Sequence, residues 1–134
     1  MQHFAKYAKV FGYLKDYRAS LFEEAEQKGW PVARSMFMEF PGDAKVWDES
    51  LMASQLMFGS DFLVAPVVTE GGVTKGVYFP TYDGCMQWVS AWNSEQTYDC
   101  GAEVTVEAAL GYIPVFYKVE SQVGPGLTEF LATL

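Results

Sequence analysis

Two aspartates, Asp43 and Asp61, are the first residues to consider for chemistry, because a pair of carboxylates can divide the work of nucleophile and general acid. Asp43 closes a turn that begins with Pro41 and Gly42, and Asp61 stands just past the end of an expected short helix. A turn and a helix end are not settings that mark a catalytic pair. We therefore assign no catalytic residue to this chain.

Other side chains could bind a ligand, but each has a more common structural explanation. Arg34 stands in an apolar stretch and could bind an anionic substrate, although a buried arginine is usually paired with an internal carboxylate. Trp88 and Trp92 could stack on a flat ligand, although alternate aromatics on a strand usually belong to a core. His3 is expected to be a plain helical surface or packing residue. The substrate-binding residues thus stay unknown.

The cysteines and the histidine of the sequence predict neither a metal site nor a disulfide. Cys85 and Cys100 stand 15 positions apart, and the single histidine, His3, is far from both, so no tetrahedral metal set can be assembled. We expect no metal and no cofactor. A disulfide scaffold of this length normally carries more cysteines, so the pattern favours two reduced thiols in a cytoplasmic protein.

Composition sets the limits of the fold and of the partners. The chain has 134 residues, of which 50% are apolar and 19% are charged, which is typical of one globular domain or two small pieces and excludes a complete (β/α)8 barrel. The formal net charge of −8 has the wrong sign for binding phosphates, so neither nucleic acid nor a membrane is an expected partner. No apolar run approaches the roughly 18 residues of a membrane span.

The first part of the chain must form helices around one strand. Apolar residues recur at helical spacing from residue 4 to residue 28, and Gly29 with Pro31 marks the end of that helix. No capping residue precedes its start, so we expect the chain to be a truncated piece. The apolar stretch at 31–40 predicts a strand buried on both faces, and Asp48 predicts the cap of a short helix that runs to residue 59.

The second part has the pattern of an antiparallel sheet followed by a helix. Short apolar runs separated by turn residues predict five strands, at 62–68, 76–80, 86–92, 103–108 and 113–118. The alternation at 103–108 predicts a sheet with one wet face, and residues 127–134 predict a short docking helix. The strand at 31–40 has no partner in its own half. Either it joins the downstream sheet, or it is the last strand of a larger barrel.

Several separated motifs decide between these two alternatives. The segments GWPVARSMF at 29–37 with EFPGD at 39–43, and QLMFGSDFLVAPV at 55–67, resemble glycoside hydrolase family 31. Further matches are VYFP at 77–80, the two tryptophans Trp88 and Trp92, and IPVF at 113–116, so that the resemblance covers residues 3–120. Within the family, the ending PVFYK at 114–118 resembles that of the sulfoquinovosidases most.

The resemblance implies an α+β chain in which residues 1–61 are the last helix–strand–helix of a (β/α)8 barrel, residues 62–120 a β-sandwich domain and residues 121–134 a tail helix. It also implies a retaining α-glycoside hydrolase, acting on sulfoquinovosides or α-glucosides, whose two catalytic aspartates lie on earlier barrel strands. The isolated chain is then expected to be inactive and to dock on the missing barrel.

Two alternatives stay open beside this interpretation. The chain could be a free-standing carbohydrate-binding module that uses Trp88, Trp92 or Tyr82 for stacking, or a separate subunit that completes a barrel.

Overall fold

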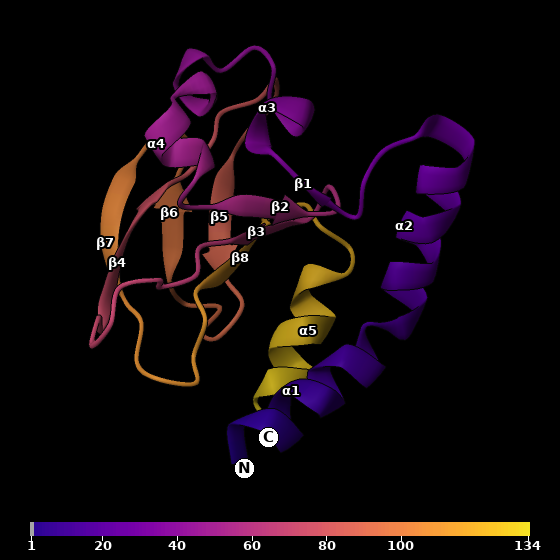
Figure 1. The fold of residues 1–134 in the computed structure, drawn as a ribbon, viewed down its shortest axis with the longest axis vertical. Helices are drawn as coiled ribbons and strands as arrows, with labels where there is room; N and C mark the ends of the chain where they lie inside the picture. Colours follow the sequence, from indigo (N-terminus) through magenta and orange to yellow (C-terminus); the bar gives the residue numbers. More distant parts are fainter. Residues whose placement is uncertain (1) are drawn as a thin grey trace.

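A computed structural model describes residues 2–134, which form helices and short strands in the order shown in Figure 1. The helices are α1 (Gln2–Tyr13), α2 (Lys15–Lys28), α3 (Met36–Glu39), α4 (Glu49–Met52), α5 (Gly124–Leu131) and the 3₁₀ helix η1 (Ala44–Trp47). The strands are β1 (Ala33–Arg34), β2 (Leu56–Phe58), β3 (Phe62–Val64), β4 (Thr74–Tyr78), β5 (Gln87–Ser90), β6 (Thr97–Asp99), β7 (Glu103–Glu107) and β8 (Val115–Lys118). None of these helices is both long and apolar enough to cross a membrane.

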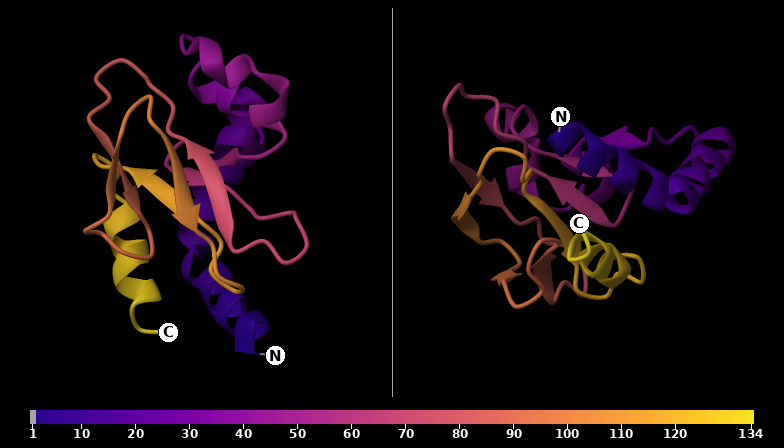
Figure 2. Two further views of the ribbon diagram at one scale, coloured as in Figure 1. Left: turned by 90° about the vertical axis from the view of Figure 1, so that its left-hand side faces the viewer. Right: turned by 90° about the horizontal axis from the view of Figure 1, so that it is seen from below.

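The long N-terminal helix is present but broken in two. It is interrupted at Leu14, two residues after Gly12, a residue type at which helices commonly kink. Its predicted end is confirmed, because Gly29 takes the left-handed conformation with φ 74° and donates its N–H to the Ala25 carbonyl. Tyr13 at the end of α1 stacks on Phe130 of α5, with ring centroids 4.4 Å apart, so these helices lie side by side (Figure 2).

The predicted strand at 31–40 is wrong over most of its length. Only Ala33 and Arg34 are extended, and α3 begins directly after Ser35. The apolar run belongs to a helical turn, because Met36 and Phe40 stand four positions apart and are both buried in the core. A short apolar run cannot be assigned to strand or helix from its periodicity alone.

The short helix expected up to residue 59 also stops early. Its predicted cap is confirmed, since the Asp48 carboxylate accepts the N–H groups of Ser50 and Leu51. The residues at 56–58 instead form β2, which pairs antiparallel with β1 and β3.

The main sheet has six strands in the order β1-β2-β3-β8-β5-β6, and β4 pairs separately with β7. Every pairing is antiparallel. The strand that had no partner in its half of the sequence thus joins the downstream sheet through β2. The five strands expected in the second half all appear near their predicted places, whereas β6 was not predicted.

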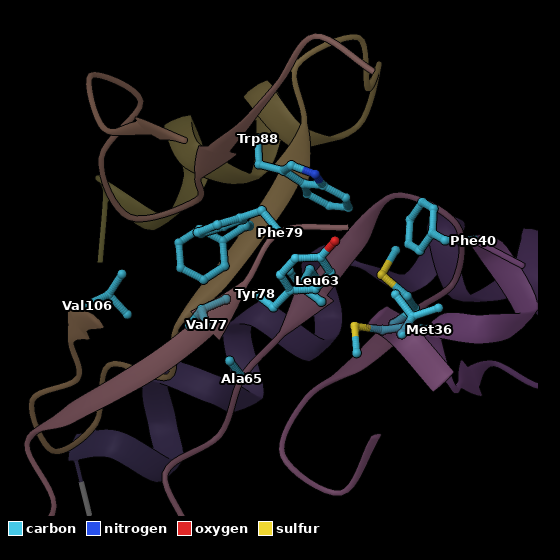
Figure 3. Packing of buried hydrophobic residues seen from close by; sticks show 12 residues of the cluster. Met36, Phe40, Leu63, Ala65, Val77, Tyr78, Phe79, Trp88 and Val106 are labelled. Atoms are coloured by element: carbon cyan, nitrogen blue, oxygen red, sulfur yellow. The ribbon is translucent and has the colours of Figure 1, made fainter. Parts of the chain in front are cut away.

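Successive residues of the main sheet point into two different cores. In β5 and β8, Trp88 and Phe116 belong to the first cluster, whereas their neighbours Val89 and Tyr117 belong to the second. The first cluster lies between the main sheet and the β4–β7 pair, where Figure 3 shows Trp88, Phe79 and Val77 packed together. The second cluster lies under α5. The wet face predicted for residues 103–108 is found in β7, where Glu103, Thr105 and Glu107 are exposed.

The two cysteines form a disulfide, so the prediction of two reduced thiols is wrong. Cys85 precedes β5 and Cys100 follows β6, and the pairing of Gln87 with Asp99 brings the two Cα atoms to 6.3 Å. The number of cysteines in the sequence carries no information on this hairpin register.

Candidate functional site

The loop that follows α3 is organised by one carboxylate. Oδ1 of Asp43 accepts the Lys45 N–H at 3.0 Å. Oδ2 accepts the Tyr78 hydroxyl at 2.6 Å, and both the backbone N–H and the hydroxyl of Thr81 at 2.9 and 3.2 Å. Asp43 is 8% exposed, so nearly all of its accepting capacity is used inside the protein. The carboxylate ties the loop to the end of β4.

These hydrogen bonds keep Asp43 ionised. Burial raises the pKa of its carboxyl, but the bonds from Thr81, Tyr78 and Lys45 together outweigh burial and hold the pKa below its usual range. Burial, and then the hydrogen bond to Asp43, raise the pKa of the Tyr78 hydroxyl. A general acid needs a raised carboxyl pKa. Asp43 is therefore equipped as an acceptor that orders the loop.

The position of Tyr78 depends on a second buried side chain. The amide of Gln55, which is 1% exposed, accepts the Tyr78 N–H at 3.0 Å and donates to its carbonyl at 2.6 Å. The Gln55 amide thus pairs with both backbone groups of Tyr78, as a neighbouring strand would. Figure 3 shows Tyr78 among its core neighbours. Gln55 lies in the motif at 55–67 and Tyr78 in the motif at 77–80, but no sequence pattern indicates a role for either residue.

A groove of about 390 Å³ opens beside this loop. Its walls are the loop after Glu39 and the segment that follows β4, with Tyr82 between them. The Tyr82 hydroxyl donates to Glu120, and the Lys118 ammonium lies 4.8 Å from the centroid of the Tyr82 ring. Burial raises the pKa of Tyr82, and the bond to Glu120 adds to this effect. The aromatic wall of the groove is therefore held in place by Glu120 and Lys118.

Asp61 belongs to a different network. It lies in the β2–β3 turn, where its N–H donates to the Tyr17 hydroxyl at 3.3 Å, and that hydroxyl donates to the Phe58 carbonyl at 3.0 Å. Gly59 in this turn has φ 66°, and a Cβ there would overlap the Tyr17 hydroxyl. The structure thus gives Asp43 and Asp61 separate sets of partners.

Arg34 is a paired internal arginine, as the sequence favoured. Its side chain is fully buried, and Nη1 contacts Glu24 at 3.1 Å and Glu39 at 2.6 Å. Nε donates to the Pro31 carbonyl at 2.8 Å. The guanidinium therefore joins α2, β1 and α3.

The two tryptophans differ in burial. Trp88 is 0% exposed and donates its indole N–H to the Pro80 carbonyl at 3.0 Å, so its predicted place in the core is confirmed. Trp92 is only half-buried, and its indole N–H donates to the Ile113 carbonyl at 2.7 Å. His3 is exposed on α1, with its ring against Gly111, which confirms a surface and packing role.

Across residues 2–134, no group of three or more His, Cys, Asp or Glu side chains is arranged to hold a metal ion.

Residues 29–122 match the family described as the glycosyl hydrolase family 31 C-terminal domain. The sulfoquinovosidase of Escherichia coli K12 is 37% identical over 120 residues, which are 90% of this chain and 16% of that protein.

Two solved structures are also similar. One is a GH31 family sulfoquinovosidase from E. rectale in complex with an aza-sugar inhibitor, at TM-score 0.85 and 34% identity, covering 99% of this chain and 18% of that one. The other is a GH31 α-xylosidase from a soil metagenome complexed with xylose, at TM-score 0.76 and 32% identity, covering 85% and 16%. The chain thus spans less than a fifth of the length of these relatives.

Proposed function

Because the chain belongs to glycoside hydrolase family 31, we propose that it forms the C-terminal part of a retaining α-glycoside hydrolase whose catalytic aspartates lie outside these residues. The similarity to a sulfoquinovosidase structure over 99% of the chain carries this proposal. A retaining enzyme needs a free nucleophile and an acid whose carboxyl groups lie about 5–5.5 Å apart. Both oxygens of Asp43 already accept hydrogen bonds inside the protein, which supports placing the catalytic aspartates elsewhere.

In this proposal residues 1–61 end a (β/α)8 barrel, residues 62–120 form the β-sandwich domain and residues 121–134 carry the terminal helix. In this proposal the main sheet continues across residue 61, because β1 and β2 pair antiparallel at its edge and β2 pairs with β3. The Arg34 ion pairs, which hold helices on either side of β1, agree with a helix–strand–helix unit.

The role of this part would be to hold the segment after β1, which consists of α3 and the loop that carries Asp43. Active sites of such barrels lie at the carboxyl ends of the strands, where the loops after them gather. Asp43 fixes that loop to β4 through Tyr78 and Thr81, and the groove beside Tyr82 opens next to it. The β-sandwich would thereby support the substrate-binding face without touching the reacting bond.

For the substrate we propose an α-linked sulfoquinovoside. The E. coli relative and the E. rectale structure, both sulfoquinovosidases, support this choice over an α-glucoside. The Cys85–Cys100 disulfide favours an oxidising compartment over the cytoplasm, because structural disulfides are rare in reducing compartments.

An activity assay tests the proposal. The 134-residue chain, incubated with aryl α-sulfoquinovoside and aryl α-glucoside, is expected to release no aryl alcohol. Turnover that disappears in Asp43→Asn or Asp61→Asn would contradict it. Sequencing upstream of Met1 gives a second test, in which an open frame with two strand-end aspartates is expected. A frame that lacks them would favour a separately encoded, barrel-completing subunit.

A further inference from the structure

A second groove lies between the β5–β6 hairpin and β7. Its lining residues come from positions 90–116, well after the Asp43 loop in the sequence. Its volume is about 440 Å³, and it shares no lining residue with the groove beside Tyr82. Ligand pockets commonly measure about 300–1,000 Å³, so this space can hold a small molecule. We propose that it binds a neutral saccharide of one or two sugar rings.

Aromatic side chains line this groove and are fixed before any ligand arrives. The Trp92 indole is anchored by its bond to the Ile113 carbonyl and meets the Tyr112 ring edge-on, with centroids 5.1 Å apart. The Tyr98 ring stacks on Phe79 at 4.5 Å, so one of its faces is covered by the core. Sugar rings present flat C–H faces that pack on such rings. Rings already held in place lower the entropic cost of binding.

Polar side chains complete the lining. Gln96, Thr105 and Glu107 are all exposed and line the same groove. An amide both donates and accepts hydrogen bonds, and a carboxylate accepts from two hydroxyl groups, so together they match the adjacent hydroxyls of a sugar. The combination of aromatic rings with an amide, a hydroxyl and a carboxylate is what distinguishes this groove from an apolar one.

The charge of the lining selects against acidic sugars. Glu107 is the only charged residue among those that line the groove, and it would repel a sulfonate or phosphate. The Lys6 ammonium lies 3.8 Å from the centroid of the Tyr112 ring and 5.0 Å from that of Trp92, donates to the Gly111 carbonyl at 2.6 Å, and does not line the groove. The groove is therefore suited to an uncharged sugar, and differs in this respect from the substrate proposed for the complete enzyme.

This inference does not rest on the proposed function, because a free-standing module would use the groove in the same way. The test titrates the 134-residue chain with glucose, maltose and glucose 6-phosphate, followed by tryptophan fluorescence and calorimetry. Saturable binding in the millimolar range is expected for the neutral sugars, with the phosphate bound more weakly. Absence of saturable binding, or a phosphate bound as tightly as glucose, would overturn the proposal.

Variants locate the site. Gln96→Ala and Glu107→Gln change exposed side chains and are each expected to weaken maltose binding about three- to tenfold, the effect of losing one hydrogen bond. Trp92→Ala should abolish binding, and its melting curve reports whether it still folds. Trp47→Ala removes a 51% exposed indole outside the groove and is the matched control. If Gln96→Ala and Glu107→Gln both bind maltose as tightly as the unchanged chain, the sugar binds outside this groove and the assignment is overturned.

Discussion

The Tyr78 hydroxyl donates to Oδ2 of Asp43 at 2.6 Å, and this bond joins β4 to the loop after α3 across 35 positions of sequence. Tyr78 is 4% exposed, so water cannot easily replace a lost partner. Hydrogen bonds to charged groups contribute more to stability than bonds between neutral groups. The pair is therefore the most informative place to test how the loop is held.

Replacing Tyr78 by Phe removes this bond and keeps the ring. We expect the free energy of unfolding to fall by about 1–3 kcal/mol, because a buried carboxylate oxygen loses its shortest partner. Urea unfolding followed by circular dichroism measures the loss. Tyr13→Phe, at a ring that is 43% exposed, is the control and should change little. Equal stability of the two variants would show that the bond is not important.

The depressed pKa of Asp43 makes stability depend on pH in one direction. Its contribution is present above the pKa of the unfolded chain, whose usual value is 3.8, and is lost as the pH falls through the folded-state pKa. Asp43→Asn should therefore destabilise the chain near neutral pH, with a penalty that shrinks in acid. Thermal melts over a pH series measure this. Asp83→Asn, at an exposed aspartate, is the control, and a penalty for Asp43→Asn that grows in acid would contradict the assignment.

Trp88→Ala should be among the most damaging substitutions in the chain. The side chain is fully buried and makes edge contacts with Phe40 and Tyr82, so its removal should cost about 3–5 kcal/mol of unfolding free energy. Trp47→Ala, at an indole that is 51% exposed, should cost clearly less. Chemical denaturation of both variants measures the difference, and similar losses would argue against Trp88 as a core residue.

The disulfide leads to a prediction about reducing conditions. A cross-link between residues 15 positions apart stabilises a fold by roughly 2–4 kcal/mol, chiefly by restricting the unfolded chain. Dithiothreitol, or the double change of Cys85 and Cys100 to Ser, should therefore lower the free energy of unfolding by about this amount. A thiol assay on the denatured, unreduced chain should find no free thiol. Detection of two free thiols would contradict the disulfide and support the reduced cysteines that the sequence predicted.

Features with a local cause could be predicted from the sequence. Gly29 ends a helix because its backbone can take positive φ, and Asp48 caps α4 because its carboxylate reaches the N–H groups two and three residues on. The alternation of Val104 and Val106 with polar neighbours placed β7 correctly. In each case the determining contacts lie within a few residues.

Features with distant partners could not be predicted in this way. The resemblance included Tyr78 and Asp43 in separate motifs, but their contact depends on Gln55 and on the pairing of β4. Met36 and Phe40 suit a buried strand as well as a buried helical turn, and only the packing on the core decides between them. The three-residue strand β6 holds a single half-buried residue, Tyr98, and is too short to give a pattern.

The place of β8 in the main sheet has a consequence for synthesis of the chain. Among the strands formed by residues 2–134, β8 is made last, yet it lies between β3 and β5 and joins the two halves of the main sheet. A nascent chain that ends before Val115 therefore carries two open strand edges, which can pair with other nascent chains. Strand pairing between distant segments is also slow. Synthesis of β8 therefore covers both open edges at once, because this strand pairs with β3 on one side and with β5 on the other.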